Sequence, residues 1–175
     1  IRLLSPKVIF EIGTFRGYTA RTMARNAPEG CRIYTLDLPP ERFGESRLRQ
    51  HAFDAENIRL NENHKPAIGD LYRQDDIARG KITQLYGSSD AFDYSDFKDR
   101  VGLFLIDGAH SYDFVRNDTE RALECVSPGG VIVWHDLKGG FRGLVRYIRE
   151  LGSRQVLYHI KGTSLVLCWP RGRGE

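Results

Sequence analysis

The stretch Val8-Ile9-Phe10-Glu11-Ile12-Gly13-Thr14-Phe15-Arg16-Gly17-Tyr18 decides the fold of this 175-residue chain. It begins as a short apolar run of strand-forming residues and is broken by two glycines, Gly13 and Gly17. Small and apolar residues then follow the i, i+3, i+4, i+7 spacing of a helix face: Ala20, Met23, Ala24 and Ala27. A strand, a glycine turn and a helix in this order predict a nucleotide-binding βα unit. The glycines let the backbone approach a ligand, and the helix N-terminus offers free N–H groups.

The motif differs from the dinucleotide fingerprint G-x-G-x-x-G because Glu11 stands just before the turn. A carboxylate at this position would repel a pyrophosphate but would suit a cationic ligand. The pattern E-x-G-x-x-x-G resembles motif I of the class I S-adenosylmethionine (SAM) methyltransferases, and SAM carries a sulfonium and an ammonium but no phosphate. The alternative is an ordinary buried strand followed by a glycine turn.

A second strand is expected at Arg32–Asp37, and it ends in an acid that lies 24 residues after Gly13. An acid near that separation accepts hydrogen bonds from the ribose hydroxyls of an adenosine. NAD and SAM share this adenosine, so Asp37 supports either cofactor. Its alternative role is to close the strand before Pro39-Pro40.

The rest of the chain continues the alternation of strands and helices. Further strands are expected at 81–86, 101–106, 131–134, 156–160 and 164–169, and helices at 67–80 (with Gly80 as C-cap), 93–99, 115–126 and 141–151. This order predicts an α/β fold: a Rossmann-like, doubly wound, mostly parallel seven-stranded sheet with a C-terminal antiparallel hairpin strand. We expect one domain over 1–175, with a lid, a substrate-side insertion or a surface loop at 39–66 and a flexible tail at 170–175.

Polar residues follow five successive strands: Gly13–Gly17, Asp37, Gly87–Asp90, Asp107–Tyr112 and His135-Asp136. In open α/β sheets, ligands bind outside the carboxyl ends of the strands. The five groups are therefore expected to form one site.

The last two groups place Asp107, His110, His135 and Asp136 on neighbouring strands. Oxygen and imidazole donors suit Mg²⁺, Mn²⁺ or Fe²⁺. Such an ion would hold a substrate hydroxyl and lower its pKa, or either histidine would act as general base. The alternative is that Asp107 caps the next helix and no metal binds.

Three segments in this order resemble the SAM-dependent methyltransferase family called methyltransferase type 24, which includes cephalosporin-hydroxylase-like and macrocin-type O-methyltransferases. The segments are Phe10–Tyr18 (E-I-G-T), Leu105–Tyr112 (I-D-G-x-H-x-Y) with Asp118 downstream, and Pro128–Asp136 (ending in H-D). The resemblance extends from about Val8 to Thr163.

The resemblance implies which residues bind SAM: Glu11, Gly13, Thr14, Phe15, Gly17, Asp37, Leu38, Gly87, Ser88, Ser89 and Asp107. In metal-dependent relatives, carboxylates after the fourth and fifth strands hold the ion, and they correspond to Asp107 and Asp136; we add His135 to this set. Two features depart from the family. The acid that often follows the glycine of the third strand is displaced to Asp90, and a histidine stands at 135 where catechol-type relatives have an acid.

The expected function is SAM-dependent O-methylation of a small molecule or sugar hydroxyl, assisted by Mg²⁺ or another divalent cation. Asp107 and His110 would be catalytic, with His110 taking the proton. Two alternatives stay open: a catalytically inactive SAM-binding or structural domain of the same fold, and an NAD-dependent oxidoreductase. Glu11 and the final hairpin argue against the oxidoreductase.

The composition sets the wider expectations. A net charge of +3 from 26 basic and 23 acidic residues gives no reason to expect nucleic acid as a partner. Three separated cysteines without a C-x-x-C fit a cytoplasmic protein. Neither a membrane-spanning run nor a signal peptide is recognised. The expected partner is a small-molecule acceptor, a homo-oligomer is left open, and the start at Ile1 suggests a fragment of a longer protein.

Overall fold

The computed structural model describes residues 1–48 and 67–170. Its strands are β1 (Val8–Ile12), β2 (Arg32–Asp37), β3 (Ile82–Tyr86), β4 (Val101–Ile106), β5 (Val126–Trp134), β6 (Leu157–His159) and β7 (Val166–Cys168). Its α-helices are α1 (Tyr18–Asn26), α3 (Asp70–Arg73), α4 (Asp76–Lys81), α5 (Tyr112–Cys125) and α6 (Arg142–Leu151). Two short 3₁₀ helices, η1 (Pro40–Glu45) and η2 (Ser95–Phe97), lie in the connections.

The strands form one seven-stranded sheet in the order β3-β2-β1-β4-β5-β7-β6. The five strands from β3 to β5 in this order are parallel, whereas β7 runs antiparallel to both β5 and β6. The predicted fold class, including the antiparallel C-terminal strand, is thereby confirmed. The order reverses between β1 and β4, which puts a ligand crevice at the carboxyl end of β1.

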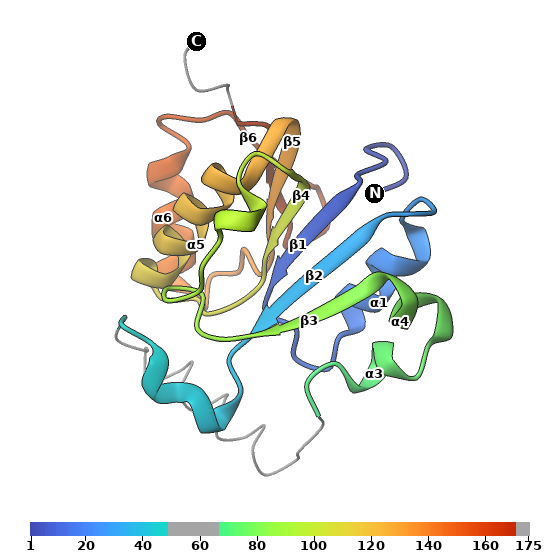
Figure 1. Ribbon diagram of the computed structural model, residues 1–175. Coiled ribbons are helices and arrows are strands. Elements are labelled where there is room, and N and C mark those ends of the chain that lie inside the picture. Colours follow the sequence, from blue (N-terminus) through green and yellow to red (C-terminus); the bar gives the residue numbers. More distant parts are fainter. Residues whose placement is uncertain (49–66, 171–175) are drawn as a thin grey trace.

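Helices cover the two faces of the sheet, with α5 and α6 on one side and α1, α3 and α4 on the other (Figure 1). Each face has its own apolar core. The core beneath α5 and α6 is centred on aromatic rings, with Phe10 and Phe104 stacked 4.9 Å apart between centroids. In the second, Ile9 and Ile33 pack against Met23 of α1. The parallel strands can be continuously apolar because both faces are covered.

The expected helix over 67–80 is two short helices. Gly69 precedes α3 with φ +75°, and the Asp75 side chain accepts a hydrogen bond from the Ala78 N–H at 3.2 Å and so starts α4. Gly80 therefore lies inside α4 and is not a C-cap, which corrects the prediction. The expected helix at 93–99 is only the 3₁₀ turn η2.

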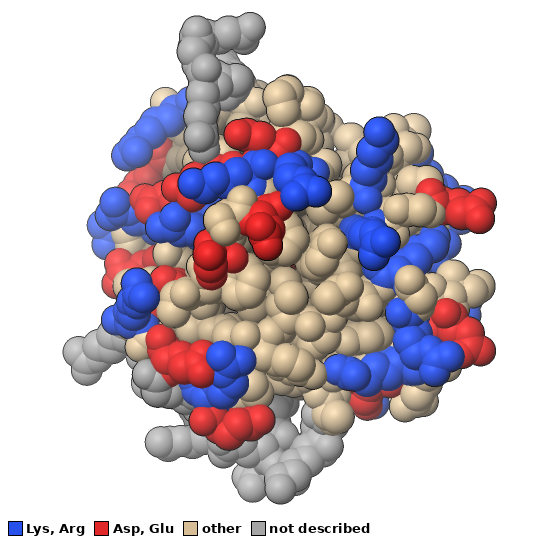
Figure 2. Space-filling view, viewed as in Figure 1, with Lys and Arg blue, Asp and Glu red and all other residues tan. Residues whose placement is uncertain are grey.

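Acidic and basic side chains lie intermixed around a broad uncharged area on the face shown in Figure 2. Among the described residues, no helix has the length and apolar character needed to cross a bilayer. The segment expected to be a lid or insertion falls mostly outside the described residues, as does nearly all of the expected tail: only 39–48 and residue 170 are described.

Candidate active site

A pocket of about 340 Å³ opens at the carboxyl ends of β1, β2 and β4 and beside the loop after β3. Its volume is in the range of small-molecule sites. Nine of the residues assigned to SAM from the sequence line it: Gly13, Thr14, Phe15, Asp37, Leu38, Gly87, Ser88, Ser89 and Asp107. The lining also includes Tyr18, His110 and Phe114, which were not assigned to the cofactor; Tyr18 directly follows the glycine turn in the sequence.

Gly13 brings β1 and β4 close together at the floor of the pocket. Its φ is +95°, and a Cβ atom there would lie 2.1 Å from the Asp107 carbonyl oxygen. Only glycine accommodates this conformation and this approach. Gly17 has φ +78° at the start of α1, where a Cβ would meet the Tyr72 ring at 2.6 Å. Gly17 therefore shapes the turn but does not line the pocket.

Asp37 organises the glycine turn from the end of β2. Its Oδ2 accepts hydrogen bonds from the N–H groups of Thr14 at 3.0 Å and Phe15 at 2.6 Å, and Oδ1 accepts from Leu38 at 2.8 Å. Burial raises the pKa of Asp37, and the three N–H groups partly oppose this. The carboxylate thus both faces the pocket and holds its turn in place.

Glu11 does not line the pocket, contrary to the expectation of a direct cofactor contact. The residue is fully buried, and its Oε2 accepts a hydrogen bond from the Thr35 hydroxyl at 2.5 Å. Burial raises the pKa of Glu11 to about 8, so the carboxyl is mostly protonated at neutral pH. The argument that an anion here attracts a cationic ligand is therefore not supported.

The displaced acid after β3 has a structural partner. Asp90 does not line the pocket; its Oδ2 accepts hydrogen bonds from the backbone N–H groups of Arg47 and Leu48, both at 2.6 Å. Its other oxygen accepts from the Ser88 hydroxyl. Asp90 therefore links the loop after β3 to the segment that follows η1.

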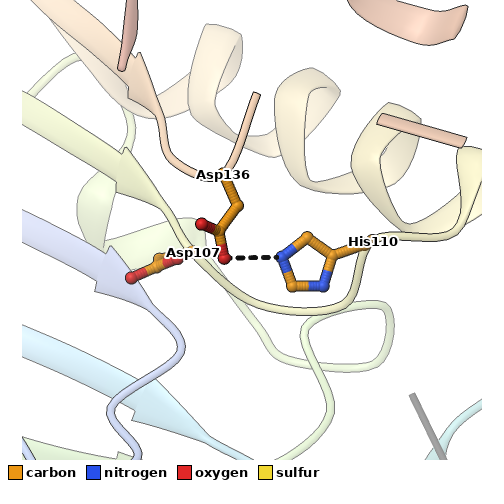
Figure 3. A group of neighbouring side chains, drawn as sticks. All are labelled: Asp107, His110 and Asp136. Carbon is orange, nitrogen blue, oxygen red and sulfur yellow. Dashed lines mark ion pairs between the residues drawn. The ribbon is translucent and has the colours of Figure 1, made fainter. Parts of the chain in front are cut away.

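Three side chains converge where β4 and β5 end (Figure 3): Asp107, His110 and Asp136. Each offers one ligand atom, and these atoms lie within 4.8 Å of one another. His110 Nε2 is 3.4 Å from Asp136 Oδ2, and the His110 ring stacks on Phe141 with 3.9 Å between centroids. Substrate choice was expected in the loop 137–141, which includes Phe141, but its contact with His110 was not predicted, because it joins segments 31 residues apart in the chain.

His135, which was predicted as a metal ligand, lies beside this group and is not a member of it. Its Nδ1 is 2.8 Å from Asp107 Oδ1 and 3.4 Å from Asp136 Oδ1. The hydrogen bond with Asp107 raises the pKa of His135. His110 takes the third position because the turn from β4 into α5 directs its ring toward Asp136.

Asp136 has an unusual backbone and a cationic neighbour. Its φ is +60°, which is uncommon for a residue other than glycine and is often found at functional sites. Lys138 Nζ donates to Asp136 Oδ1 at 2.6 Å. Partial burial opposes ionisation of Asp136, but Lys138 and the neighbouring histidines lower its pKa overall. The carboxylate is therefore available as an anionic ligand.

The donor set suits a divalent cation. Two carboxylate oxygens and an imidazole nitrogen match Mg²⁺, Mn²⁺ or Fe²⁺. A divalent cation would be held here by Asp107, His110 and Asp136 and would supply a Lewis acid at the site.

Comparison with models of protein families identifies the family of this chain. A model of a methyltransferase domain matches residues 10–137, more than half of the chain. No curated protein sequence matches the chain.

Solved structures share its fold. A provisionally assigned O-methyltransferase from Klebsiella pneumoniae is 20% identical, with a TM-score of 0.63 over 98% of this chain and 76% of the other. The O-methyltransferase TomG from Streptomyces achromogenes, involved in tomaymycin synthesis and solved with SAM, is 21% identical with a TM-score of 0.56 and the same coverage. A Bacillus cereus O-methyltransferase with S-adenosylhomocysteine (SAH) is 17% identical, with a TM-score of 0.59 over 95% and 76% of the chains.

At these identities the solved structures show the fold, and the family model shows the membership. The chain therefore belongs to the methyltransferase family whose domain model it matches, and it is a SAM-dependent methyltransferase with the seven-stranded fold of the O-methyltransferases.

Proposed function

We propose that this methyltransferase transfers the methyl group of SAM to a hydroxyl oxygen of a small molecule, with a divalent cation at Asp107 and Asp136. One observation carries the proposal: Asp107 lines the pocket and also belongs to the three-residue ligand group. A ligand in the pocket and an acceptor beside the group would then meet at one residue.

The pocket residues have separate tasks in this proposal. Asp37 and Leu38 face the adenosine, while the turn at Gly13 and Thr14 lies against the methionine part. Because methyl transfer is an in-line displacement, the protein mainly positions the two reactants.

A bound divalent cation would lower the pKa of the acceptor hydroxyl. Asp107 and Asp136 would hold the ion, and His110 would accept the proton from the hydroxyl. The geometry also permits His110 to be the third ligand, since its nitrogen lies in the same group. Stacking on Phe141 keeps the imidazole in place for either role.

Calorimetric titration of SAM and of Mn²⁺ into wild type and Asp136→Asn tests the proposal. Asp136 is the sharper choice because it does not line the SAM pocket. We expect Mn²⁺ binding to fall at least tenfold in the variant while SAM binding stays within about twofold. Methyl transfer to a panel of hydroxyl compounds, followed as SAH formation, should decrease with EDTA.

His110→Gln separates the two roles of the histidine. Slower transfer with unchanged Mn²⁺ affinity identifies a proton acceptor, whereas weaker Mn²⁺ binding identifies a ligand. Full activity in EDTA would overturn the metal-assisted part of the proposal, and absence of SAM binding in wild type would overturn the assignment of the pocket.

A further inference from the structure

A chain of buried and partly buried hydrogen bonds runs beneath the glycine turn, across β3, β2 and β1. The Tyr72 hydroxyl donates to Gln84 Oε1 at 3.0 Å, and Gln84 Nε2 donates to Thr14 Oγ1 at 2.9 Å. Thr14 Oγ1 and Thr35 Oγ1 are 2.7 Å apart, and Thr35 donates to Glu11 Oε2 at 2.5 Å. Of these five residues only Thr14 lines the pocket.

The Gln84 amide nitrogen can only donate, so Thr14 Oγ1 is an acceptor in this contact. The same nitrogen also lies within hydrogen-bond distance of the carbonyl oxygens of Thr35 at 3.0 Å and Leu85 at 2.9 Å. Glu11 Oε2 ends the chain, while Oε1 has no hydrogen-bond partner among the described residues. The Thr14 hydroxyl is therefore held between the Gln84 amide and the Thr35 hydroxyl.

These contacts matter because the backbone of Thr14 is part of the turn that Asp37 holds. The N–H groups of Thr14 and Phe15 both donate to Asp37 Oδ2, at 3.0 and 2.6 Å. The side chain of Thr14 is fixed below the turn, and its amide is thereby aimed at the carboxylate that faces the pocket. We propose that Glu11, Thr35, Gln84 and Tyr72 are positioning residues for SAM, which act through Thr14 on the turn and on Asp37.

The helix that contributes Tyr72 also holds the turn from outside. Gly69 N–H donates to the Phe15 carbonyl at 2.8 Å, and Leu71 N–H donates to the Arg16 carbonyl at 3.0 Å. Arg16 and Asp70 form an ion pair with Nη2 and Oδ2 2.9 Å apart. The turn is consequently held by α3 and its preceding residues as well as by the strands.

The inference rests on the proposed SAM site, and SAM titration of matched variants tests it. Thr35→Val removes the hydroxyl with little change in shape, and Thr35→Ser restores it. We expect Thr35→Val to weaken SAM binding about tenfold, the equivalent of one lost hydrogen bond, and Thr35→Ser to bind within about twofold of wild type. Thr83→Val is the control, because this substitution makes the same chemical change at an exposed position of β3.

Tyr72→Phe provides a second test should Thr35→Val fail to fold, since it keeps the ring against Gly17 and removes only the hydroxyl. We expect SAM binding about threefold weaker, with an unchanged thermal midpoint of the free protein. If wild type binds SAM and Thr35→Val and Tyr72→Phe bind as tightly as Thr83→Val, the positioning role is overturned while the proposed function stands. If wild type does not bind SAM, both are overturned.

Discussion

Gly13 occupies the tightest backbone position in the site. A side chain at this residue would meet the Asp107 carbonyl while the backbone stayed at φ +95°. The strain and the overlap act together, because relieving the overlap would move β1 away from β4. The residue therefore determines both the floor of the pocket and the spacing of two central strands.

Gly13→Ala should lower the free energy of unfolding by about 3 kcal/mol and abolish SAM binding. Urea unfolding and calorimetry would measure the two effects. Gly139→Ala is the matched control: nothing lies within 4 Å of its added Cβ, so its stability should stay within about 0.5 kcal/mol of wild type. Equal stability of the two variants would contradict the role given to Gly13.

The two acids near the glycine turn show how far sequence reasoning reaches at single residues. Asp37 could be placed at the pocket because its position at the end of a parallel strand fixes where it lies. The position of Glu11 could not be predicted in this way, because it depends on a neighbouring strand. The Glu11 side chain meets Thr35 of β2, whose hydroxyl donates to Glu11 Oε2. The grouping of His110 with Asp107 and Asp136 likewise depends on the turn after β4, which sets the direction of the His110 ring.

At the scale of elements, Asp90 ties the segment 46–48 to the loop after β3. The carboxylate receives two backbone N–H groups at 2.6 Å, and hydrogen bonds to charged acceptors are stronger than those to neutral ones. Among the described residues, the Asp90 side chain therefore anchors the start of the segment that follows η1.

Asp90→Ala should make the bond after Arg47 roughly tenfold more sensitive to trypsin, because losing a charged acceptor favours local opening by about 1.5 kcal/mol. Timed digestion with mass spectrometry of the fragments measures the rate. Asp76→Ala changes an acid whose side chain is 90% exposed and should leave this rate unaltered. A rate equal in all three proteins would argue against the anchor.

The regular elements were predictable, and the exceptions involve contacts between distant segments. Lys81 was placed in a strand but ends α4, where its Nζ donates to the carbonyl oxygens of Ala24 at 3.1 Å and Ala27 at 2.8 Å. These are carbonyls at the end of α1, which lack partners in their own helix. Periodicity within 67–81 carries no information about a helix end more than 50 residues earlier.

For the whole molecule, two fully buried carboxyls link stability to pH. Burial raises the pKa of Glu11 from 4.5 to about 8 and that of Asp118 from 3.8 to about 7. The folded protein therefore keeps protons that the unfolded chain releases. This contribution to stability is fully present below the unfolded pKa values and is lost as the pH rises through the folded ones.

The free energy of unfolding should thus fall between pH 5 and pH 8, by up to about 1.4 kcal/mol per pH unit for each carboxyl. Urea unfolding at several pH values measures the slope. Asp118→Asn keeps the shape of the side chain but cannot ionise. In this variant the free energy of unfolding should fall less steeply with pH, by up to about 1.4 kcal/mol per pH unit, which corresponds to one proton. A flat curve in wild type would show that the two groups are ionised in the folded state.

The order β5-β7-β6 has a consequence for how the chain is made. β6 is synthesised before β7, yet in the described sheet it pairs with β7 and not with β5. On the ribosome, residues 157–159 therefore lack their native partner strand until residues 166–168 have left the exit tunnel. The edge of β5 stays open during that interval, when the nascent chain would be most exposed to chaperones and to pairing with another copy.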